Sequence, residues 1–138
     1  MNTFTRSVEL LQRAMDVHSL RYQVSANNIA NAEVPNYKRQ TVNFESELKK
    51  AFESESETNK RLQLQRADSR HIALEEPYDW KTVEPRRVTD WATTAKANGN
   101  NVDAETEAMN ILKLQMNYRL LTQLESFEFS QIKTAIRK

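Results

Sequence analysis

The residues with the most obvious chemical potential in this chain are its two histidines and its carboxylates. His18 and His71 lie on unrelated segments, and no third ligand follows either of them at the spacing of a metal site. The 19 acidic residues are spread along helical patterns, which is typical of surface ion pairs rather than of an acid–base pair. A chain whose single glycine is Gly99 has no glycine-rich phosphate loop. The sequence therefore predicts no catalytic residue, metal or cofactor, and we expect that the protein is not an enzyme.

Composition argues against several further classes of protein. The 138 residues include no cysteine, so disulfides and thiol chemistry are absent. Lysine and arginine are interspersed with the acids and the net charge is +1, so we expect no nucleic acid as a partner. Because no catalytic or phosphate-binding constellation is present, we also expect no small-molecule substrate. No apolar run is long enough for a membrane span, and the first residues lack the apolar core of a cleavable signal peptide.

Scarce turn residues favour helix over sheet. One glycine and three prolines supply little of the turn chemistry that an all-β protein needs. We predict a mainly α structure that forms one structural unit from three segments. These are an N-terminal helix over residues 1–33, a loop, short helix and irregular, partly extended middle over 34–101, and a C-terminal helix over 102–138. The two long helices are predicted to pair as a coiled-coil-like hairpin.

The N-terminal helix carries two apolar stripes. The first follows the alternating four- and three-residue spacing of a coiled-coil seam and is predicted to pair with the C-terminal helix. Its members are Phe4, Val8, Leu11, Met15, Tyr22 and Ile29. The second stripe lies off that seam by about a third of a turn and consists of Leu10, Val17 and Val24. Because two apolar faces need two packing partners, we predict that the second stripe contacts a neighbouring subunit.

The C-terminal helix has the same two-sided character. Its predicted pairing seam consists of Ile111, Leu114, Tyr118, Leu121, Leu124 and Ile132. A second face consists of Met109, Leu112, Met116, Leu120 and Phe127. A chain of this size has one comparable helix to cover one of these faces, so the second face also predicts contact with neighbouring subunits. The turn at residues 98–101 precedes this helix, and Asn101 or Asp103 is expected to cap it.

The middle region is less regular. Residues 39–42 are expected to be extended, and Asn43 is expected to cap a short helix. The acidic residues 53–59 suggest a surface loop, and Leu62 and Leu64 give a weak strand signal. The aromatic residues Tyr78, Trp80 and Trp91 suggest either a small packed cluster or extended segments that pack on the helices.

The most distinctive stretch lies at the end of the N-terminal helix. Pro35 disfavours helix at the residue before it, so the helix should stop near residues 31–33. Asn36 tolerates a left-handed conformation and predicts a tight turn that presents Tyr37. Asn27 and Asn31 lie one turn apart on the outer face of the helix. Their amides have two open interpretations, a solvated helix end or hydrogen bonds to a neighbouring subunit.

This stretch resembles a known signature. The flagellar rod and hook family has the pattern Ala-Asn-Asn-Ile-Ala-Asn, a few residues, then Thr-Pro-Gly-Tyr-Lys. The matching residues here are Ala26, Asn27, Asn28, Ile29, Ala30 and Asn31, followed by Pro35, Asn36 and Tyr37. Glu33, Val34 and Asn36 depart from the family pattern, which affects only the fine geometry of the loop. The Gly-Asn-Asn-Val-Asp run at residues 99–103 also resembles a helix entry of this family.

The resemblance implies a self-assembling structural subunit of the proximal rod of the bacterial flagellar basal body. Its terminal helices would pack with neighbouring rod subunits and transmit torque. The implied partners are copies of itself, other rod proteins such as FlgC, the adaptor FliE and the flagellar type III export apparatus. The implied location is the rod in the periplasmic space, reached without cleavage of a signal peptide. The alternative is a generic coiled-coil adaptor or export chaperone, which shares paired helices but has no need of the turn at residues 35–37.

Overall fold

The computed structural model describes residues 3–60, 77–93 and 96–137. The elements are α1 (Thr3–Ala30), β1 (Gln40–Asn43), α2 (Glu45–Lys60), the short 3-10 helix η1 (Trp80–Thr82), β2 (Arg86–Thr89) and α3 (Ala104–Ile136). The prediction of a mainly α chain with long terminal helices is thereby confirmed. The described chain divides into two compact units. One combines the residues up to Val42 with those from Arg87 onward, and the other spans Asn43–Arg86.

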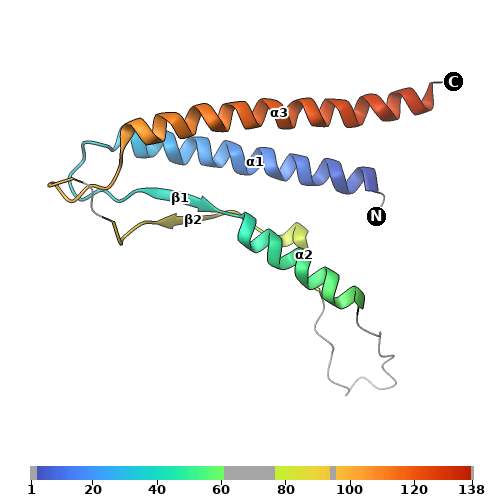
Figure 1. Ribbon diagram of the computed structural model, residues 1–138, viewed down its shortest axis with the longest axis horizontal. Coiled ribbons are helices and arrows are strands. Elements are labelled where there is room, and N and C mark those ends of the chain that lie inside the picture. The colour runs from blue at the N-terminus through green and yellow to red at the C-terminus, as the bar shows by residue number, and fades with distance from the viewer. Residues whose placement is uncertain (1–2, 61–76, 94–95, 138) are drawn as a thin grey trace, which may run out of the picture. The chain divides into compact units, whose positions relative to one another are not determined.

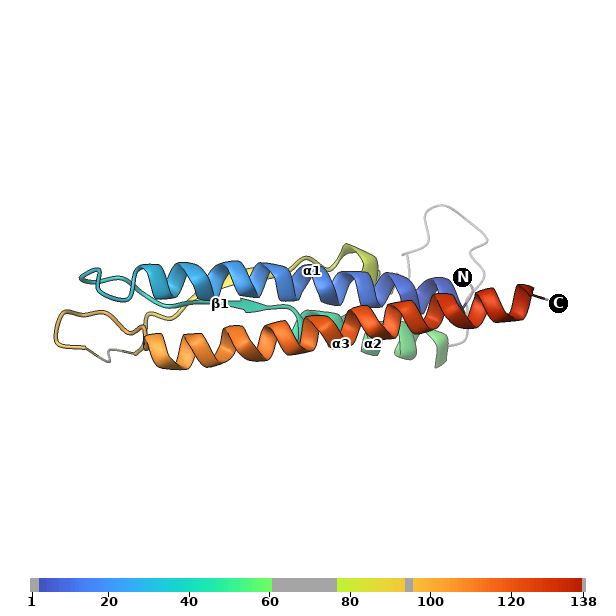
Figure 2. The same ribbon diagram turned by 90° about the horizontal axis from the view of Figure 1, so that it is seen from above.

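The first unit is built on an antiparallel helical hairpin. Both views show α1 and α3 side by side, with the chain termini at one end and the connecting loops at the other (Figure 1, Figure 2). Near the termini the rings of Phe4 and Phe129 meet edge to face, with centroids 5.7 Å apart. Further along, the Gln12 side chain donates to Glu125 Oε1 at 3.1 Å. These pairs establish the antiparallel register of the two helices.

The two helices of the hairpin are covered to different extents. α1 buries Val8, Val17 and Val24, whereas the buried residue of α3 is Glu107. The side of α3 that is partly covered carries Ile111, Leu114, Leu121 and Ile132, which belong to the predicted seam. α1 is therefore covered around more of its circumference than α3.

A short two-stranded ribbon runs back from the loop end of the hairpin. β1 pairs with β2, and their pairing is extended by a 2.9 Å bond from the Asp90 amide to the Arg39 carbonyl. Arg21 of α1 reaches β1 and donates to the Val42 carbonyl at 3.2 Å. The predicted extended segment at residues 39–42 is confirmed, although the ordered strand begins one residue later.

The second unit has a small core of its own. Ala51 and Val83 are buried, as are Phe44 and Trp80, and the Trp80 ring lies 6.3 Å from that of Phe52. The predicted three-residue aromatic cluster is wrong. Tyr78 and Trp91 are 47% and 76% exposed, and only Trp80 is buried.

Two expectations for the middle region need correction. Residues 53–59 are the second half of α2 rather than a surface loop. Glutamate and lysine are good helix formers, and an ion pair between Lys49 and Glu53 at 3.6 Å supports this part of the helix. Asn43, the predicted cap, lies two residues before α2 begins at Glu45, and its side chain accepts a 2.8 Å bond from the Ser46 hydroxyl rather than from a backbone amide of the helix. The strand signal at Leu62 and Leu64 lies outside the described residues.

Candidate assembly interface

Asn28 of the signature is fully buried at the junction of α1 and β1. Its side-chain amide donates to the Gln40 carbonyl at 2.8 Å and accepts from the Gln40 backbone amide at 3.0 Å. The Tyr37 hydroxyl donates to the same Asn28 oxygen at 3.3 Å. The side chain thus gives Gln40 the paired bonds that a strand neighbour would supply. It attaches the start of β1 to the last turn of α1.

Asn100 makes the matching connection from the other loop. It is fully buried, and its amide nitrogen lies 2.9, 3.1 and 2.8 Å from the carbonyl oxygens of Asn31, Ala32 and Val34. The Asn100 oxygen accepts from the backbone amide of Val102 at 2.7 Å. A helix end leaves carbonyls without intrahelical partners. Asn100 satisfies such carbonyls at the end of α1 from about seventy residues away in the chain.

The two loops also interlock through backbone geometry. Asn36 has a φ of 58°, which confirms the predicted left-handed turn, and its amide donates to the Asn98 carbonyl at 3.0 Å. Gly99 has a φ of 79°, and a Cβ atom on it would lie 2.5 Å from Asn36 Oδ1. Glycine is therefore required where the second loop crosses the first. The Tyr37 ring is partly covered rather than presented outward, and burial, with a smaller contribution from Glu107, raises the pKa of its hydroxyl.

A buried ion pair attaches α3 to the same junction. Glu107 is 1% exposed, and its Oε1 lies 2.5 Å from Arg39 Nε. Its second carboxylate oxygen is buried without a hydrogen-bond partner among the described residues. Asn101 accepts from the Arg39 backbone amide at 2.6 Å and donates to the Asp90 carbonyl and the Thr93 hydroxyl, both at 2.9 Å. The loops, β1 and the first turn of α3 thus form one hydrogen-bonded junction.

Of the two residues proposed to cap α3, Asp103 is the one that does so. Its carboxylate accepts from the Glu105 amide at 3.1 Å and from the Thr106 hydroxyl. These bonds lower the pKa of Asp103, with the Thr106 hydroxyl as the largest cause. Asn101, the other candidate, is engaged at the junction described above.

The outer asparagines of the signature behave differently from Asn28. The Asn31 side chain donates to the Asn27 carbonyl at 2.7 Å, one helical turn back, and the Asn27 side chain is exposed. The Asn31 amide is thus engaged within its own helix. Of the two interpretations left open by the sequence, this contact favours the helix end over a bond to a neighbour.

Most of the predicted pairing seam is buried or partly covered. On α1, Val8 is buried, and Phe4, Leu11, Met15 and Ile29 are partly covered. On α3, the partly covered members are Ile111, Leu114, Leu121 and Ile132. Tyr22, Tyr118 and Leu124 lie at the edge, each 43–44% exposed. A helix with 3.6 residues per turn drifts by about 20° per heptad from a strict seven-residue repeat. That drift brings Asn117 and Glu125 to partly covered positions beside the seam.

The predicted inter-subunit face divides between open and covered residues. Five side chains form the open part on α3 and are each more than half exposed. They are Met109, Leu112, Met116, Leu120 and Phe127, and we call them the α3 outer stripe. The α1 members differ, because Leu10 is partly covered and Val17 and Val24 are each only 3% exposed. Val24 and residues 40–42 of the chain's own strand line the same pocket.

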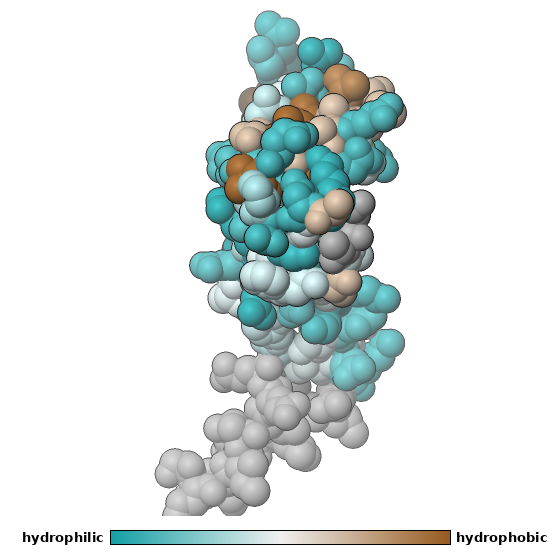
Figure 3. Space-filling model, turned by 90° about the vertical axis from the view of Figure 1, so that its left-hand side faces the viewer, coloured by the Kyte–Doolittle hydropathy of each residue, from teal (hydrophilic) through white to brown (hydrophobic). Residues whose placement is uncertain are grey.

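The loop end of the hairpin contrasts with the α3 outer stripe. Viewed from that end, the surface is mostly hydrophilic, with small separate apolar patches (Figure 3).

No helix in the described part of the chain combines the length and apolarity of a bilayer span. Within residues 3–60, 77–93 and 96–137, no three histidine or acidic side chains gather as metal ligands would.

Sequence reasoning missed the residues that organise the junction. Asn28 was recognised as part of the signature but not as a buried residue. A signal was present, because Val17, Val24 and Asn28 follow one another at seven- and four-residue spacing and therefore share a helix face. Nothing in the linear sequence indicated the pairing of Arg39 with Glu107, because these two residues lie far apart in the chain.

Comparison with known proteins identifies the family. No protein-family model matches the chain. It is 39% identical over 137 residues to the flagellar basal body rod protein FlgB of Borreliella burgdorferi, covering 99% of this chain and all of that protein. FlgB of Borrelia hermsii is 38% identical with the same coverage, and FlgB of Bacillus subtilis is 28% identical over 136 residues. Both the signature at the end of α1 and the full-length similarity agree that this chain belongs to the FlgB family of flagellar basal body rod proteins.

Proposed function

We propose that this chain packs onto neighbouring rod subunits through the α3 outer stripe and transmits torque through those contacts. Membership of the FlgB family makes it a structural component of the flagellar basal body rod, assembled with other rod components. The observation that carries the proposal is the exposure of five large apolar side chains on a single face of α3. Contiguous apolar surface of this kind marks protein–protein contact sites.

The energetic argument is simple. Full burial of a large apolar side chain contributes about 1.5–3 kcal/mol. The five side chains are 55–71% exposed, so covering them supplies roughly 4–9 kcal/mol, which offsets much of the cost of bringing two proteins together. The stripe therefore favours association, and further contacts supply the remaining free energy.

We propose the partners and the location from the resemblance of the signature to the rod family. The neighbours are copies of this chain and rod proteins such as FlgC on one side, with the adaptor FliE at the membrane-proximal end. The subunit reaches the periplasmic part of the rod through the type III export apparatus without cleavage of a signal peptide. α3, with 33 residues, is about 50 Å long, and such a stiff element can carry torque between subunits.

The test replaces Leu120 by aspartate. In Leu120→Asp the charge must be desolvated on packing, so we expect loss of swimming while the purified subunit retains its helix content and melting temperature. Ser126→Asp is the matched control, because it adds the same charge to an exposed polar position of α3 away from the stripe. Normal motility of cells that carry Leu120→Asp would contradict the proposal.

The association state of the purified chain distinguishes an adaptor or chaperone from a rod subunit. An adaptor buries its apolar face in a closed dimer, whereas a rod subunit forms monomers that add to open-ended assemblies. Sedimentation of the purified chain over a range of concentrations distinguishes the two. A discrete dimer that Leu120→Asp dissociates would favour the alternative.

A further inference from the structure

An asparagine–glycine pair lies where the two loops of the first unit cross. Asn98 is exposed and directly precedes Gly99, the single glycine of the chain. In any peptide, the backbone nitrogen that follows an asparagine can attack the side-chain amide carbon of that asparagine. Glycine hinders this attack least because it has no Cβ atom. Every other asparagine of the chain precedes a larger residue, so position 98 is the most reactive one in the unfolded chain.

The reaction is a deamidation that proceeds through a succinimide. The Gly99 nitrogen gives its proton to a solvent base and forms a bond to Asn98 Cγ. The bond from Cγ to Nδ2 breaks, and Nδ2 takes a proton from water and leaves as ammonia. Water then opens the succinimide ring at one of its two carbonyls, which leaves either aspartate or isoaspartate at position 98. Solvent supplies the base, the proton and the water, so the chemistry needs no enzyme and no cofactor.

The folded loops restrain the groups that this reaction has to move. The Gly99 amide donates to the Lys96 carbonyl at 3.0 Å, and Asn98 Oδ1 accepts from the Asn100 amide at 3.1 Å. The Asn98 carbonyl accepts from the Asn36 amide at 3.0 Å. To close the ring, the Gly99 nitrogen must give up its bond to Lys96 and the Asn98 side chain must turn away from Asn100. Ring closure therefore competes with hydrogen bonds of the folded state.

The surroundings of Gly99 couple this movement to the rest of the junction. A Cβ atom on Gly99 would lie 2.5 Å from Asn36 Oδ1, so the Asn36 side chain lies close against the glycine backbone. Asn100, the next residue, is fully buried, and its amide nitrogen bonds to carbonyls at the end of α1. Rotation of the peptide between residues 98 and 99 thus disturbs contacts on both of its sides.

We propose that Asn98 is a deamidation site that the folded junction keeps unreactive and that reacts when the junction opens. The isoaspartate product carries the backbone through the side chain of residue 98 and adds a methylene group to it, so the bond from the Asn36 amide is lost. The aspartate product keeps the backbone and an oxygen that accepts from the Asn100 amide. Deamidation thus marks chains that have left the folded state. The inference does not depend on the α3 outer stripe.

The first test compares the folded and the unfolded chain. The purified protein is incubated at mildly alkaline pH, with and without guanidinium chloride, and peptide mapping by mass spectrometry measures aspartate and isoaspartate at position 98. We expect deamidation to be roughly tenfold or more faster in guanidinium, because folded amides react only through opening. In guanidinium, Asn31 and Asn101 are expected to react more slowly than Asn98. Equal rates at position 98 in the two conditions would overturn the proposal.

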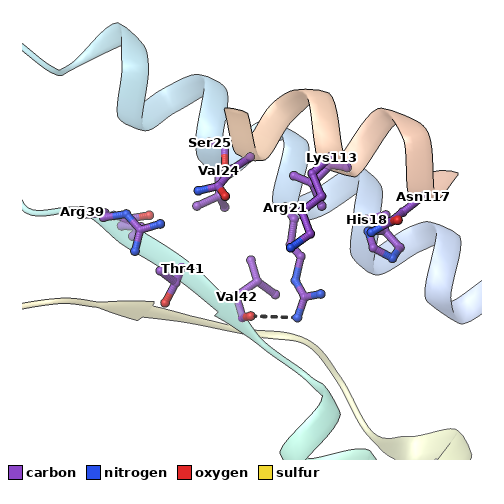
Figure 4. Close-up of a pocket in the computed structure, with 12 residues that line it drawn as sticks. His18, Arg21, Val24, Ser25, Arg39, Thr41, Val42, Lys113 and Asn117 are labelled. Atoms are coloured by element: carbon purple, nitrogen blue, oxygen red, sulfur yellow. Dashed lines mark hydrogen bonds between the residues drawn. The ribbon is translucent and has the colours of Figure 1, made fainter. Parts of the chain in front are cut away.

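The second test opens the junction without denaturant. β1 is held to α1 by Asn28, which bonds to Gln40, and by Arg21, which donates to the Val42 carbonyl (Figure 4). Asn28→Ala removes the contact nearer the loops and leaves the Arg21 bond in place. Deamidation at position 98 in buffer is therefore expected to rise several-fold in this variant.

Asn27→Ala is the matched control for the second test. Asn27 is exposed beside Asn28, so this variant is expected to deamidate at the rate of the parent. Circular dichroism verifies that both variants retain the helix content of the parent. A folded Asn28→Ala chain that deamidates no faster than Asn27→Ala would contradict protection by the junction. If Asn28→Ala does not fold, the comparison of the parent with and without guanidinium still decides the proposal.

Discussion

At the scale of single residues, the signature asparagines are not equivalent. Asn28 is buried and bonds to both backbone groups of Gln40, whereas Asn27 beside it is exposed. An asparagine amide offers one donor group and one acceptor group in a plane, which is the arrangement that a strand backbone requires. The side chain at position 28 therefore supports the strand, and the one at position 27 is available to solvent.

This difference predicts unequal effects of alanine substitution. Asn28→Ala leaves the partly buried Gln40 backbone groups without these partners and is expected to lower the free energy of unfolding by about 1–3 kcal/mol. Asn27→Ala, its matched control, is expected to change it by less than about 0.5 kcal/mol. Urea denaturation of the three proteins measures both values. Equal loss in the two variants would contradict the assigned role of Asn28.

At the scale of elements, α3 has two apolar faces, one partly covered on the side of α1 and one exposed. Leu121 is partly covered on the side that faces α1, and Leu120 belongs to the outer stripe. Adjacent residues on a helix are separated by about 100° around its axis. A charge at position 121 is therefore expected to disturb the pairing of α3 with α1, whereas a charge at position 120 is expected to disturb packing on a neighbouring subunit.

Leu121→Asp is expected to destabilise the isolated hairpin by about 2 kcal/mol, because it places a carboxylate in the helix-pairing seam. Leu120→Asp, by contrast, is expected to leave monomer stability unchanged and to block assembly. Thermal melts of the two purified variants are the measurement. A monomer that melts at the same temperature with either substitution would show that the seam contributes little to the pairing of α1 and α3.

The start of α3 is expected to respond to acid. Because the capping bonds lower the pKa of Asp103 in the folded chain, its contribution to stability is present above the unfolded pKa, about 3.9. That contribution is lost as the pH falls through the lowered folded value. Asp103→Ala should therefore melt below the parent at pH 7, and the difference should shrink towards pH 2.

Asp103→Asn provides the control for this pH dependence. Asparagine caps helices without ionising, so the helix start in this variant is expected to be insensitive to acid. Circular dichroism melts at several pH values make the comparison. A difference between Asp103→Ala and the parent that is constant down to pH 2 would exclude the carboxylate as its source.

At the scale of the whole molecule, stability is expected to vary along the first unit. The buried asparagines and the Arg39–Glu107 pair gather at the loop end, whereas Phe127, Phe129 and Ile136 near the end of α3 are all more than half exposed. Buried, hydrogen-bonded backbone opens less often than exposed helix ends.

Amide hydrogen exchange on the purified chain should show this gradient. We expect the strongest protection at residues 17–30 and 100–107, and the weakest at residues 129–136 of α3. The parent and Asn28→Ala are compared, since loss of the junction should reduce protection at the loop end first. Uniformly fast exchange in both long helices would mean instead that they become ordered only on assembly.

The parts of the structure that depend on local sequence were predictable. Helix periodicity predicted α1 and α3, Pro35 predicted the end of α1, and Asn36 predicted the left-handed turn. Residues 39–42 were correctly expected to be extended. The acidic half of α2 was missed because its weak apolar pattern obscured the helix propensity of glutamate and lysine. Each of these features depends on steric and hydrogen-bonding preferences within a few residues.

The sequence by itself thus determined the long helices, the loop signature and the family. Only the tertiary structure decided which apolar face stays open, since Val17 and Val24 are covered while the α3 outer stripe is exposed. It also decided that Asn28 and Asn100 are buried and that Arg39 pairs with Glu107. The physical reason is that helix periodicity reports an apolar face but not what covers it. That depends on contacts between residues far apart in the chain, such as those of Asn100 with the end of α1.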